Sequence, residues 1–183
     1  MSASSFSDTA AHLLGAVVNA EPAADRATGV VYAATGEGML HALDSETGNE
    51  LWAYVPGAAL ADLGQTAARS YAFKTQLDGS PVIRSIGATR LLVAGLGVSG
   101  RSFYALDVTT PKSYNASNLA SKVLWEFPAA SDATTKAKVG QAVGKPLIVK
   151  LSGNQWAVVV SSGYNNNDGI GRIWVLNAST GAI

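Results

Sequence analysis

The stretch Ala42–Trp52 reads Ala-Leu-Asp-Ser-Glu-Thr-Gly-Asn-Glu-Leu-Trp, and it decides the fold. Its apolar start and its apolar-aromatic end predict two short strands joined by a tight turn. Asp44 is placed to accept backbone N–H bonds within that turn, and Gly48 to adopt a positive φ. Trp52 then stands on the second strand, where its large ring can pack against a neighbouring sheet. We interpret these residues as structural, with turn and docking roles.

The same pattern recurs along the chain. An apolar strand, a glycine-bearing turn and a second apolar strand ending in Asp or Asn occur three times, at 29–44, 89–107 and 155–177. The third copy repeats the turn from Asn177 to Gly181, whereas the second departs from it after Asp107.

Two further strands complete each unit. A proline, which a sheet tolerates at the first residue of a strand, stands upstream of every copy, as Pro22, Pro81 and Pro146. A short apolar-aromatic strand follows the first two copies, at 50–54 and at 123–127, where Trp125 matches Trp52. Four antiparallel strands per unit, repeated, predict blades of a β-propeller.

We therefore expect an all-β chain of about three four-stranded units, at roughly 12–56, 77–128 and 140–183, preceded by a disordered or cloning-derived end at 1–11. Small residues with leucines three apart predict a short helix at 56–65, and polar composition predicts surface loops at 111–121 and 129–138. Propellers close with about four to eight blades. Three units therefore form a partial propeller, either a piece of a larger ring or a chain whose open edges pair with another copy.

Composition excludes several classes of protein. Thirteen basic side chains balance thirteen acidic ones, so the chain lacks the basic excess of a nucleic-acid binder. The absence of cysteine excludes disulfides, thiolate metal sites and cysteine nucleophiles. No apolar run is long enough to cross a membrane, and residues 1–8 do not resemble a signal peptide. If the protein is exported, we expect its signal elsewhere.

Candidate chemistry is sparse. Residues 95–100 match G-x-G-x-x-G, but an alternating strand follows them where a dinucleotide site needs a helix, so we interpret them as a hairpin turn. The turn at 164–171 offers oxygen ligands from Asn165, Asn167 and Asp168, a weak cation site because it has a single carboxylate. His12 and His41 have no neighbours that suggest a catalytic triad. We therefore predict no catalytic residue and no cofactor in this segment.

The repeat resembles that of quinoprotein-like propellers, which run A-x-D-x-x-T-G-x-x-x-W. An ordered series of motifs is more closely similar to the C-terminal propeller of the PilY1/PilC type IV pilus tip-associated adhesins. These motifs begin with HLLGAVVN at 12–19 and continue with VYAA at 31–34, GMLHALD at 38–44, AYVP at 53–56, LDGSP at 77–81, VAGLG at 93–97, YALDVT at 104–109, LWEF at 124–127, GKP at 144–146, WAV at 156–158 and SGYN at 162–165.

The resemblance implies part of a large exported protein, at the cell surface, pilus tip, periplasm or outer membrane of a Gram-negative bacterium. Such proteins support pilus assembly, oppose retraction and serve adhesion, so pilin subunits or a host-surface receptor are the expected partners. The family's calcium loop, D-x-D-x-D-G-x-x-D, is not in this sequence. Calcium control therefore does not carry over to any residue here. The loops at 60–73, 112–121 and 129–138 are the expected binding surface, since binding residues concentrate on loops held by a rigid scaffold.

Two alternatives stay open. A quinone-cofactor dehydrogenase shares the tryptophan-bearing repeat, but it would need a complete ring, a calcium ion and a catalytic Asp, and commonly has a vicinal cysteine pair. A periplasmic scaffold propeller that binds partner strands along its edges is the other.

Overall fold

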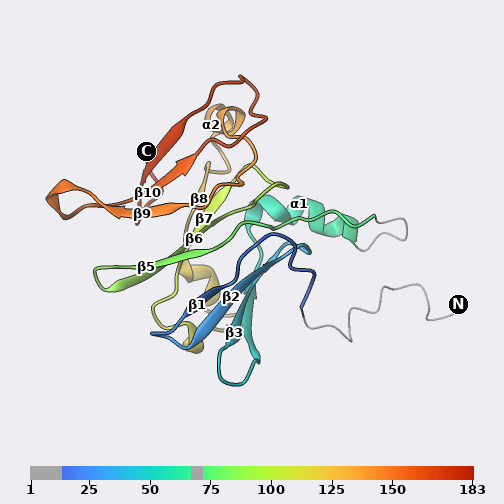
Figure 1. The fold of residues 1–183 in the computed structure, drawn as a ribbon, viewed down its shortest axis with the longest axis vertical. Helices are drawn as coiled ribbons and strands as arrows, with labels where there is room; N and C mark the ends of the chain where they lie inside the picture. Colours follow the sequence, from blue (N-terminus) through green and yellow to red (C-terminus); the bar gives the residue numbers. More distant parts are fainter. Residues whose placement is uncertain (1–13, 67–71) are drawn as a thin grey trace, which may run out of the picture.

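The computed structural model describes residues 14–66 and 72–183. Figure 1 shows three β-sheets arranged side by side. The predicted end at 1–11 lies outside the described residues. The first sheet has the order β1-β2-β3-β4, the second β5-β6-β7-β8 and the third β11-β10-β9, and the neighbouring strands pair antiparallel throughout. The prediction of an all-β partial propeller is confirmed, although the third sheet has three strands in the described residues where four were expected.

The strands have the bounds that the repeat predicts within a few residues. The first sheet contains β1 (Ala23–Asp25), β2 (Val30–Thr35), β3 (Met39–Asp44) and β4 (Glu50–Tyr54). The second contains β5 (Val82–Ile86), β6 (Thr89–Gly95), β7 (Phe103–Asp107) and β8 (Val123–Phe127). The third contains β9 (Leu147–Lys150), β10 (Trp156–Ser161) and β11 (Ile173–Asn177).

Proline marks the entry to every sheet. β1, β5 and β9 each begin at the residue directly after Pro22, Pro81 or Pro146. Because proline lacks an N–H, it can precede a ladder but not continue one from within. The sheets also share an irregularity, since the register shifts between Ala42 and Leu43 in the first and between Ala105 and Leu106 in the second.

The connections carry the helices. The predicted short helix is present as α1 (Gly57–Thr66). The prediction of a plain loop at 129–138 was wrong, because α2 (Ala133–Lys138) forms there, with the side chain of Asp132 accepting from the backbone N–H of Thr135, 2.9 Å away. Short 3-10 helices at Pro111–Ser113 and Leu119–Lys122 interrupt the 111–121 loop, and a third spans Ser152–Asn154.

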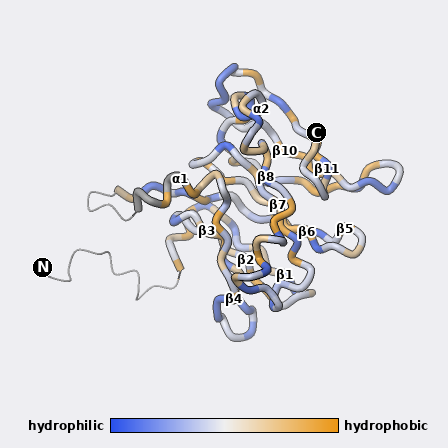
Figure 2. The backbone as a smooth tube through the Cα atoms, turned by 180° about the vertical axis from the view of Figure 1, so that it is seen from behind, coloured by the Kyte–Doolittle hydropathy of each residue, from blue (hydrophilic) through white to orange (hydrophobic). Residues whose placement is uncertain are grey.

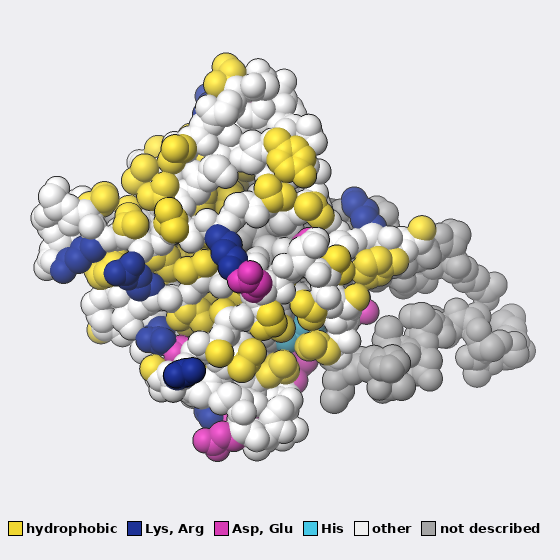
Figure 3. All heavy atoms as spheres, viewed as in Figure 1, with side chains coloured by type: hydrophobic (Ala, Val, Ile, Leu, Met, Phe, Trp, Pro, Cys, Tyr) yellow, Lys and Arg dark blue, Asp and Glu magenta, His cyan; other side chains and the backbone are white. Residues whose placement is uncertain are grey.

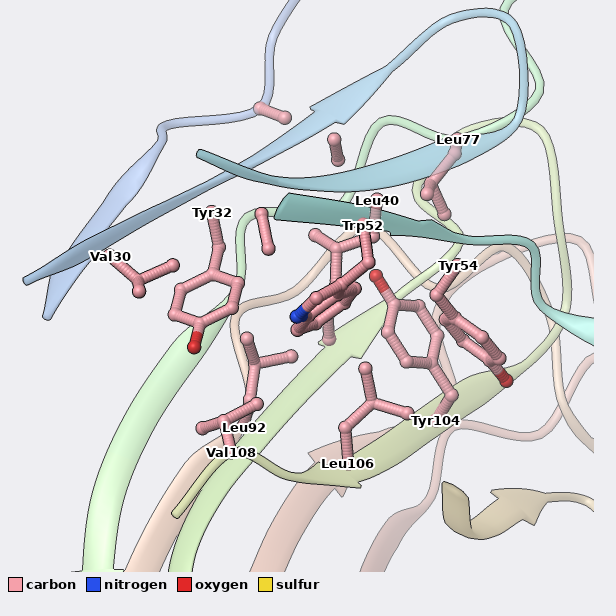
Figure 4. Packing of buried hydrophobic residues seen from close by; sticks show 14 of the residues in the cluster. Val30, Tyr32, Leu40, Trp52, Tyr54, Leu77, Leu92, Tyr104, Leu106 and Val108 are labelled. Atoms are coloured by element: carbon pink, nitrogen blue, oxygen red, sulfur yellow. The ribbon is translucent and has the colours of Figure 1, made fainter. Parts of the chain in front are cut away.

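The core lies between the sheets. Figure 4 shows how side chains of the first sheet, including Tyr32 and Trp52, meet side chains of the second, including Leu92 and Leu106. A separate cluster joins the other face of the second sheet to the third, with Val93 and Phe103 packed in the same cluster as Val158 and Leu176. Successive strand residues point to opposite faces, so the apolar run Leu91–Ala94 on β6 serves both clusters.

Candidate functional site

The two tryptophans of the repeat join neighbouring sheets. On β4, Trp52 is 6 % exposed and donates from Nε1 to the carbonyl oxygen of Pro111, 2.9 Å away in the β7–β8 connection of the second sheet. Its ring centroid lies 5.9 Å from that of Tyr32 and 6.0 Å from that of Tyr114, within the range of favourable aromatic pairs. The indole thus fixes the first sheet to the second.

Trp125 makes the same connection one sheet later. It stands on β8, is 7 % exposed, and donates from Nε1 to the carbonyl oxygen of Ala178, 2.9 Å away in the turn that follows β11. The ring lies so close to Gly181 that a Cβ added there would be 2.7 Å from Trp125 Cγ. Gly181 also has a φ of +69°, so both backbone and space favour glycine.

The Asp turn has the geometry that the sequence pattern suggests. Asp44 accepts the backbone N–H groups of Glu46 and Thr47 at 2.9 and 3.1 Å, and Gly48 has a φ of +75°. Lys112 Nζ lies 2.8 Å from Asp44 Oδ2, and this ammonium together with the two backbone donors lowers the pKa of Asp44 to about 2.

The other two copies also place a side-chain oxygen at this position, but only Asp107 carries the charge. Asn177 accepts from Ser179 and Thr180 at the same distances, 2.9 and 3.1 Å, without a formal charge. Asp107 accepts the backbone N–H and the hydroxyl of Thr109, 2.9 Å away for the N–H. The turn therefore uses a side-chain oxygen to accept backbone N–H groups, and a negative charge on that side chain is not needed for these hydrogen bonds.

An ion pair connects the first hairpins of the first two sheets. Arg90 donates to both carboxylate oxygens of Asp25, whose side chain is completely buried, and the backbone N–H of Ala27 also reaches this carboxylate. Burial by itself raises the pKa of Asp25, but the hydrogen bonds from Arg90 and from the backbone outweigh it, and the pKa is lowered.

The third sheet has a groove near its β11 edge. A groove of about 290 Å³ is lined by residues from the β9–β10 hairpin, β11 and the turn after it: Leu151, Gln155, Trp156, Ala157, Val175, Leu176, Asn177, Thr180, Ala182 and Ile183. Figure 2 shows β10 and β11 at this margin of the molecule, next to the C-terminal end. Sequence reasoning missed this groove, because it depends on which sheet faces are covered.

The weak cation candidate is held together by protein groups. Asp168 accepts two hydrogen bonds from Arg172, at 2.8 and 2.5 Å, and this pairing lowers the pKa of Asp168 to about 2. Asn167 Oδ1 accepts from Arg101 at 2.7 Å, and Asn165 donates to the side chain of Gln141. A cation here would have to displace two guanidinium groups. In residues 14–66 and 72–183, no three His, Asp or Glu side chains are grouped to hold a metal ion.

The structure brings His41 between two partners that spacing did not suggest. Its Nδ1 lies 2.9 Å from Glu50 Oε2 and its Nε2 lies 3.3 Å from Thr35 Oγ1. The order Thr-His-Glu is that of a nucleophile, base and acid, but Thr35 is fully buried and His41 nearly so, so a substrate cannot reach the hydroxyl. Residues 95–100 lead into strand β7 rather than a helix, as the hairpin interpretation requires.

The comparisons with known proteins agree on one group. The family model described as "PilY1 beta-propeller domain" matches residues 13–181. A type IV pilus biogenesis factor PilY1 homolog of Xylella fastidiosa is 37% identical over 157 residues, which are 84% of this chain and 10% of that protein. The PilY1 factor of Pseudomonas aeruginosa is 31% identical over 167 residues, 87% of this chain and 14% of that protein. The chain thus spans about a tenth to a seventh of the length of these relatives.

Solved structures show the same likeness. The crystal structure of the P. aeruginosa PilY1 C-terminal domain matches with a TM-score of 0.65 at 30% identity, covering 84% of this chain and 29% of that one. A quinohemoprotein alcohol dehydrogenase from Comamonas testosteroni matches with a TM-score of 0.53 at 20% identity, over 92% of this chain and 20% of that one, which shows a shared fold alone. None of the helices in the described residues has the length and apolar character needed to span a membrane.

Proposed function

Since the chain belongs to the PilY1 β-propeller family, we propose that it is a non-enzymatic binding platform within an exported type IV pilus biogenesis factor. The family match over residues 13–181 carries the proposal. The platform acts at the cell surface or pilus tip, where it contributes to pilus assembly, to the control of retraction and to adhesion. Its partners are pilin subunits or a surface receptor.

The fold supports a platform because the sheets are fixed to one another at several points. Trp52 and Trp125 connect successive sheets, and the Asp25–Arg90 pair adds a charged contact. A scaffold fixed in this way holds its loops in constant relative positions, as binding loops require.

One end of the sheets is the better binding surface. The β2–β3, β6–β7 and β10–β11 turns share this end with the connections that carry α1 and α2, whereas the 112–121 loop lies at the opposite end. The three loops expected to bind together are therefore divided between two ends. The proposal that partners bind at the α1 and α2 end is supported by exposed apolar side chains there: Leu60, Phe73, Val98, Val143, Tyr164 and Ile170.

The test uses the full-length protein in its own bacterium. Tyr164→Asp combined with Ile170→Asp removes apolar surface from this end, and Ser179→Asp, in an exposed turn at the other end, is the matched control. Surface pili are counted in cells with and without an active retraction motor, and attachment is measured in parallel.

Each outcome has a distinct meaning. Fewer pili in both backgrounds indicates assembly, fewer pili only when the motor is active indicates retraction control, and lower attachment with normal piliation indicates adhesion. If deletion of residues 14–183 leaves all three readouts unchanged while the remaining protein is exported, the proposal is wrong. Quinone-dependent dye reduction by the purified protein would instead favour the dehydrogenase alternative.

A further inference from the structure

Three stretches of backbone from different connections lie side by side at the α2 end of the sheets. The backbone N–H of Ala142 donates to the carbonyl oxygen of Gly100 at 2.9 Å, and that of Gln141 donates to the carbonyl oxygen of Tyr164 at 2.9 Å. The β6–β7 turn, residues 140–142 and the β10–β11 turn therefore form one continuous surface.

Two glycines allow the second and third of these stretches to approach closely. A Cβ added to Gly140 would overlap the carbonyl oxygen of Tyr164, and one added to Gly163 would overlap that of Gln141. Any other residue at these positions would force the two backbones apart. The antiparallel bridge between Gln141 and Tyr164 places their side chains on the same face.

Amide side chains gather on this face beside Tyr164, which is 52 % exposed. Asn165 donates from Nδ2 to Gln141 Oε1 at 3.3 Å, and its φ of +61° lies in the left-handed region that Asn tolerates better than most residues. Asn167 Oδ1 accepts from Arg101 Nη1 at 2.7 Å. We call this group the Tyr164 cluster, and it consists of Tyr164, Gln141, Asn165, Asn167 and Arg101.

The polar groups of the Tyr164 cluster keep hydrogen-bonding capacity for a ligand. The bond between Asn165 and Gln141 leaves the Asn165 oxygen and the Gln141 nitrogen without a partner among the described residues. Arg101 uses only one of its N–H donors, and no carboxylate in the described part of the chain pairs with it. The nearby carboxylate of Asp168 is already paired with Arg172, so the unpaired charge of the cluster is positive.

This combination of side chains suits a sugar that carries an acid group. A pyranose ring has a face of C–H groups that can pack on an exposed aromatic ring, and a rim of hydroxyl groups that need fixed donors and acceptors. Amides both donate and accept, and a guanidinium group binds a carboxylate through two parallel hydrogen bonds. Figure 3 shows that the end with α2 and the β10–β11 turn exposes mainly uncharged polar side chains and backbone, with scattered hydrophobic side chains.

The aromatic and cationic parts of the cluster are close enough for one small ligand. Arg101 donates to Asn167, so its guanidinium group lies beside the turn that also carries Tyr164. Asn167 follows Tyr164 by three residues, and even a fully extended chain would separate their Cα atoms by only about 11 Å. An acidic disaccharide can therefore touch both groups.

We propose that the Tyr164 cluster binds an acidic saccharide on the surface of another cell. A pyranose ring packs on Tyr164, its carboxylate pairs with Arg101, and Gln141 and Asn165 hydrogen-bond its hydroxyl groups. This inference rests on the proposed function, because it names the ligand class by which the α2 end serves adhesion.

The test titrates the 183-residue chain with cellobiouronic acid and follows amide chemical shifts in NMR spectra, including the side-chain amide signals of Gln141 and Asn165. Cellobiose is the matched ligand, because it differs only in a hydroxymethyl group in place of the carboxylate. We expect saturable binding with the largest shifts at 140–142 and 163–167. At low salt cellobiose should bind about twofold to fivefold more weakly, the range for an exposed ion pair, and high salt should reduce this difference.

Variants of the chain locate the site. Tyr164→Ala is expected to abolish binding of both disaccharides, whereas Tyr164→Phe keeps the ring and is expected to retain it. Arg101→Gln is expected to bind the two disaccharides equally. Leu151→Ala is the control, because Leu151 is an exposed apolar residue in the β9–β10 hairpin at the opposite end, and it is expected to bind normally.

A competition experiment tests the source of the saccharide. Acidic oligosaccharides released from eukaryotic cell-surface glycoproteins are expected to displace cellobiouronic acid. If only the polysaccharide from the bacterium's own lipopolysaccharide displaces it, the assignment to the surface of another cell is wrong.

Three further results would overturn the proposal: the absence of saturable binding, equal binding of the two disaccharides by the unchanged chain at low salt, and normal binding by Tyr164→Ala. The proposed function is tested separately in cells. If no saccharide binds but Tyr164→Asp combined with Ile170→Asp still changes piliation or attachment, the proposed function stands and the ligand class is wrong.

Discussion

Replacement of Trp125 by alanine tests whether the indole joins the second and third sheets. The side chain is 7 % exposed, packs with Phe103, Ala105 and Leu176 in one cluster, and donates to the carbonyl oxygen of Ala178. Truncation of a tryptophan in a core costs about 3 to 5 kcal/mol. We expect Trp125→Ala to reduce the free energy of unfolding by this amount.

The hydrogen bond and the packing can be separated. Trp125→Phe keeps an aromatic ring but removes the Nε1 donor, leaving the Ala178 carbonyl without this partner. An unsatisfied buried group costs about 1 to 3 kcal/mol, so the loss should be smaller than for alanine. Urea unfolding followed by far-UV circular dichroism measures all variants, provided that the slopes with denaturant agree.

Trp156→Ala is the matched control. Trp156 is only partly buried, and its ring contacts two cations, with the Arg84 guanidinium 5.2 Å and the Lys150 ammonium 5.9 Å from its centroid. We expect this variant to lose less stability than Trp125→Ala. A loss below about 1 kcal/mol for Trp125→Ala, the range of surface substitutions, would refute the proposed joining role.

Two further predictions concern backbone and charge. Gly181→Ala should reduce the free energy of unfolding more than Gly153→Ala does. Both glycines have a positive φ, but only at Gly181 would an added Cβ overlap Trp125. In urea unfolding we expect each variant to lose about 1 to 2 kcal/mol from the backbone conformation, and Gly181→Ala to lose about 1 to 3 kcal/mol more from the overlap. Because the folded pKa of Asp25 is lowered below 3.8, the pair with Arg90 contributes stability above that pH and loses it as the pH falls through the folded pKa. Asp25→Asn should therefore lower the urea midpoint at pH 7 and show a smaller further decrease below pH 4 than the unchanged chain, and parallel pH profiles would contradict this.

Local sequence signals predicted the sheets because each signal reflects a backbone constraint. The prolines at 22, 81 and 146 cannot donate to a ladder, and β1, β5 and β9 begin directly after them. Helix α2 was missed because we gave more weight to the polar composition of 129–138 than to Asp132, although Asp is a residue type favoured at helix N-caps.

Local sequence patterns could not predict contacts that depend on the register between strands. His41 meets Glu50 across β3 and β4, where the register shifts between Ala42 and Leu43. Spacing along the chain does not show such a shift, so the sequence could not place Thr35, His41 and Glu50 together. The division of these connections between the two ends of the sheets was missed for a related reason, since it follows from the order of strands within each sheet.

The composition of β10 indicates how the third sheet is covered. A short, continuous apolar run is typical of a strand covered on both faces, and Leu91–Ala94 on β6 meets this expectation, since all four residues are buried. The run Trp156–Val160 on β10 is equally apolar, yet Val159 is only partly buried and its neighbours in the pairing, Leu147 and Val175, are 61 % and 46 % exposed. A strand whose outer face met water would carry polar residues at alternate positions. The third sheet therefore has the sequence of a sheet covered on both faces.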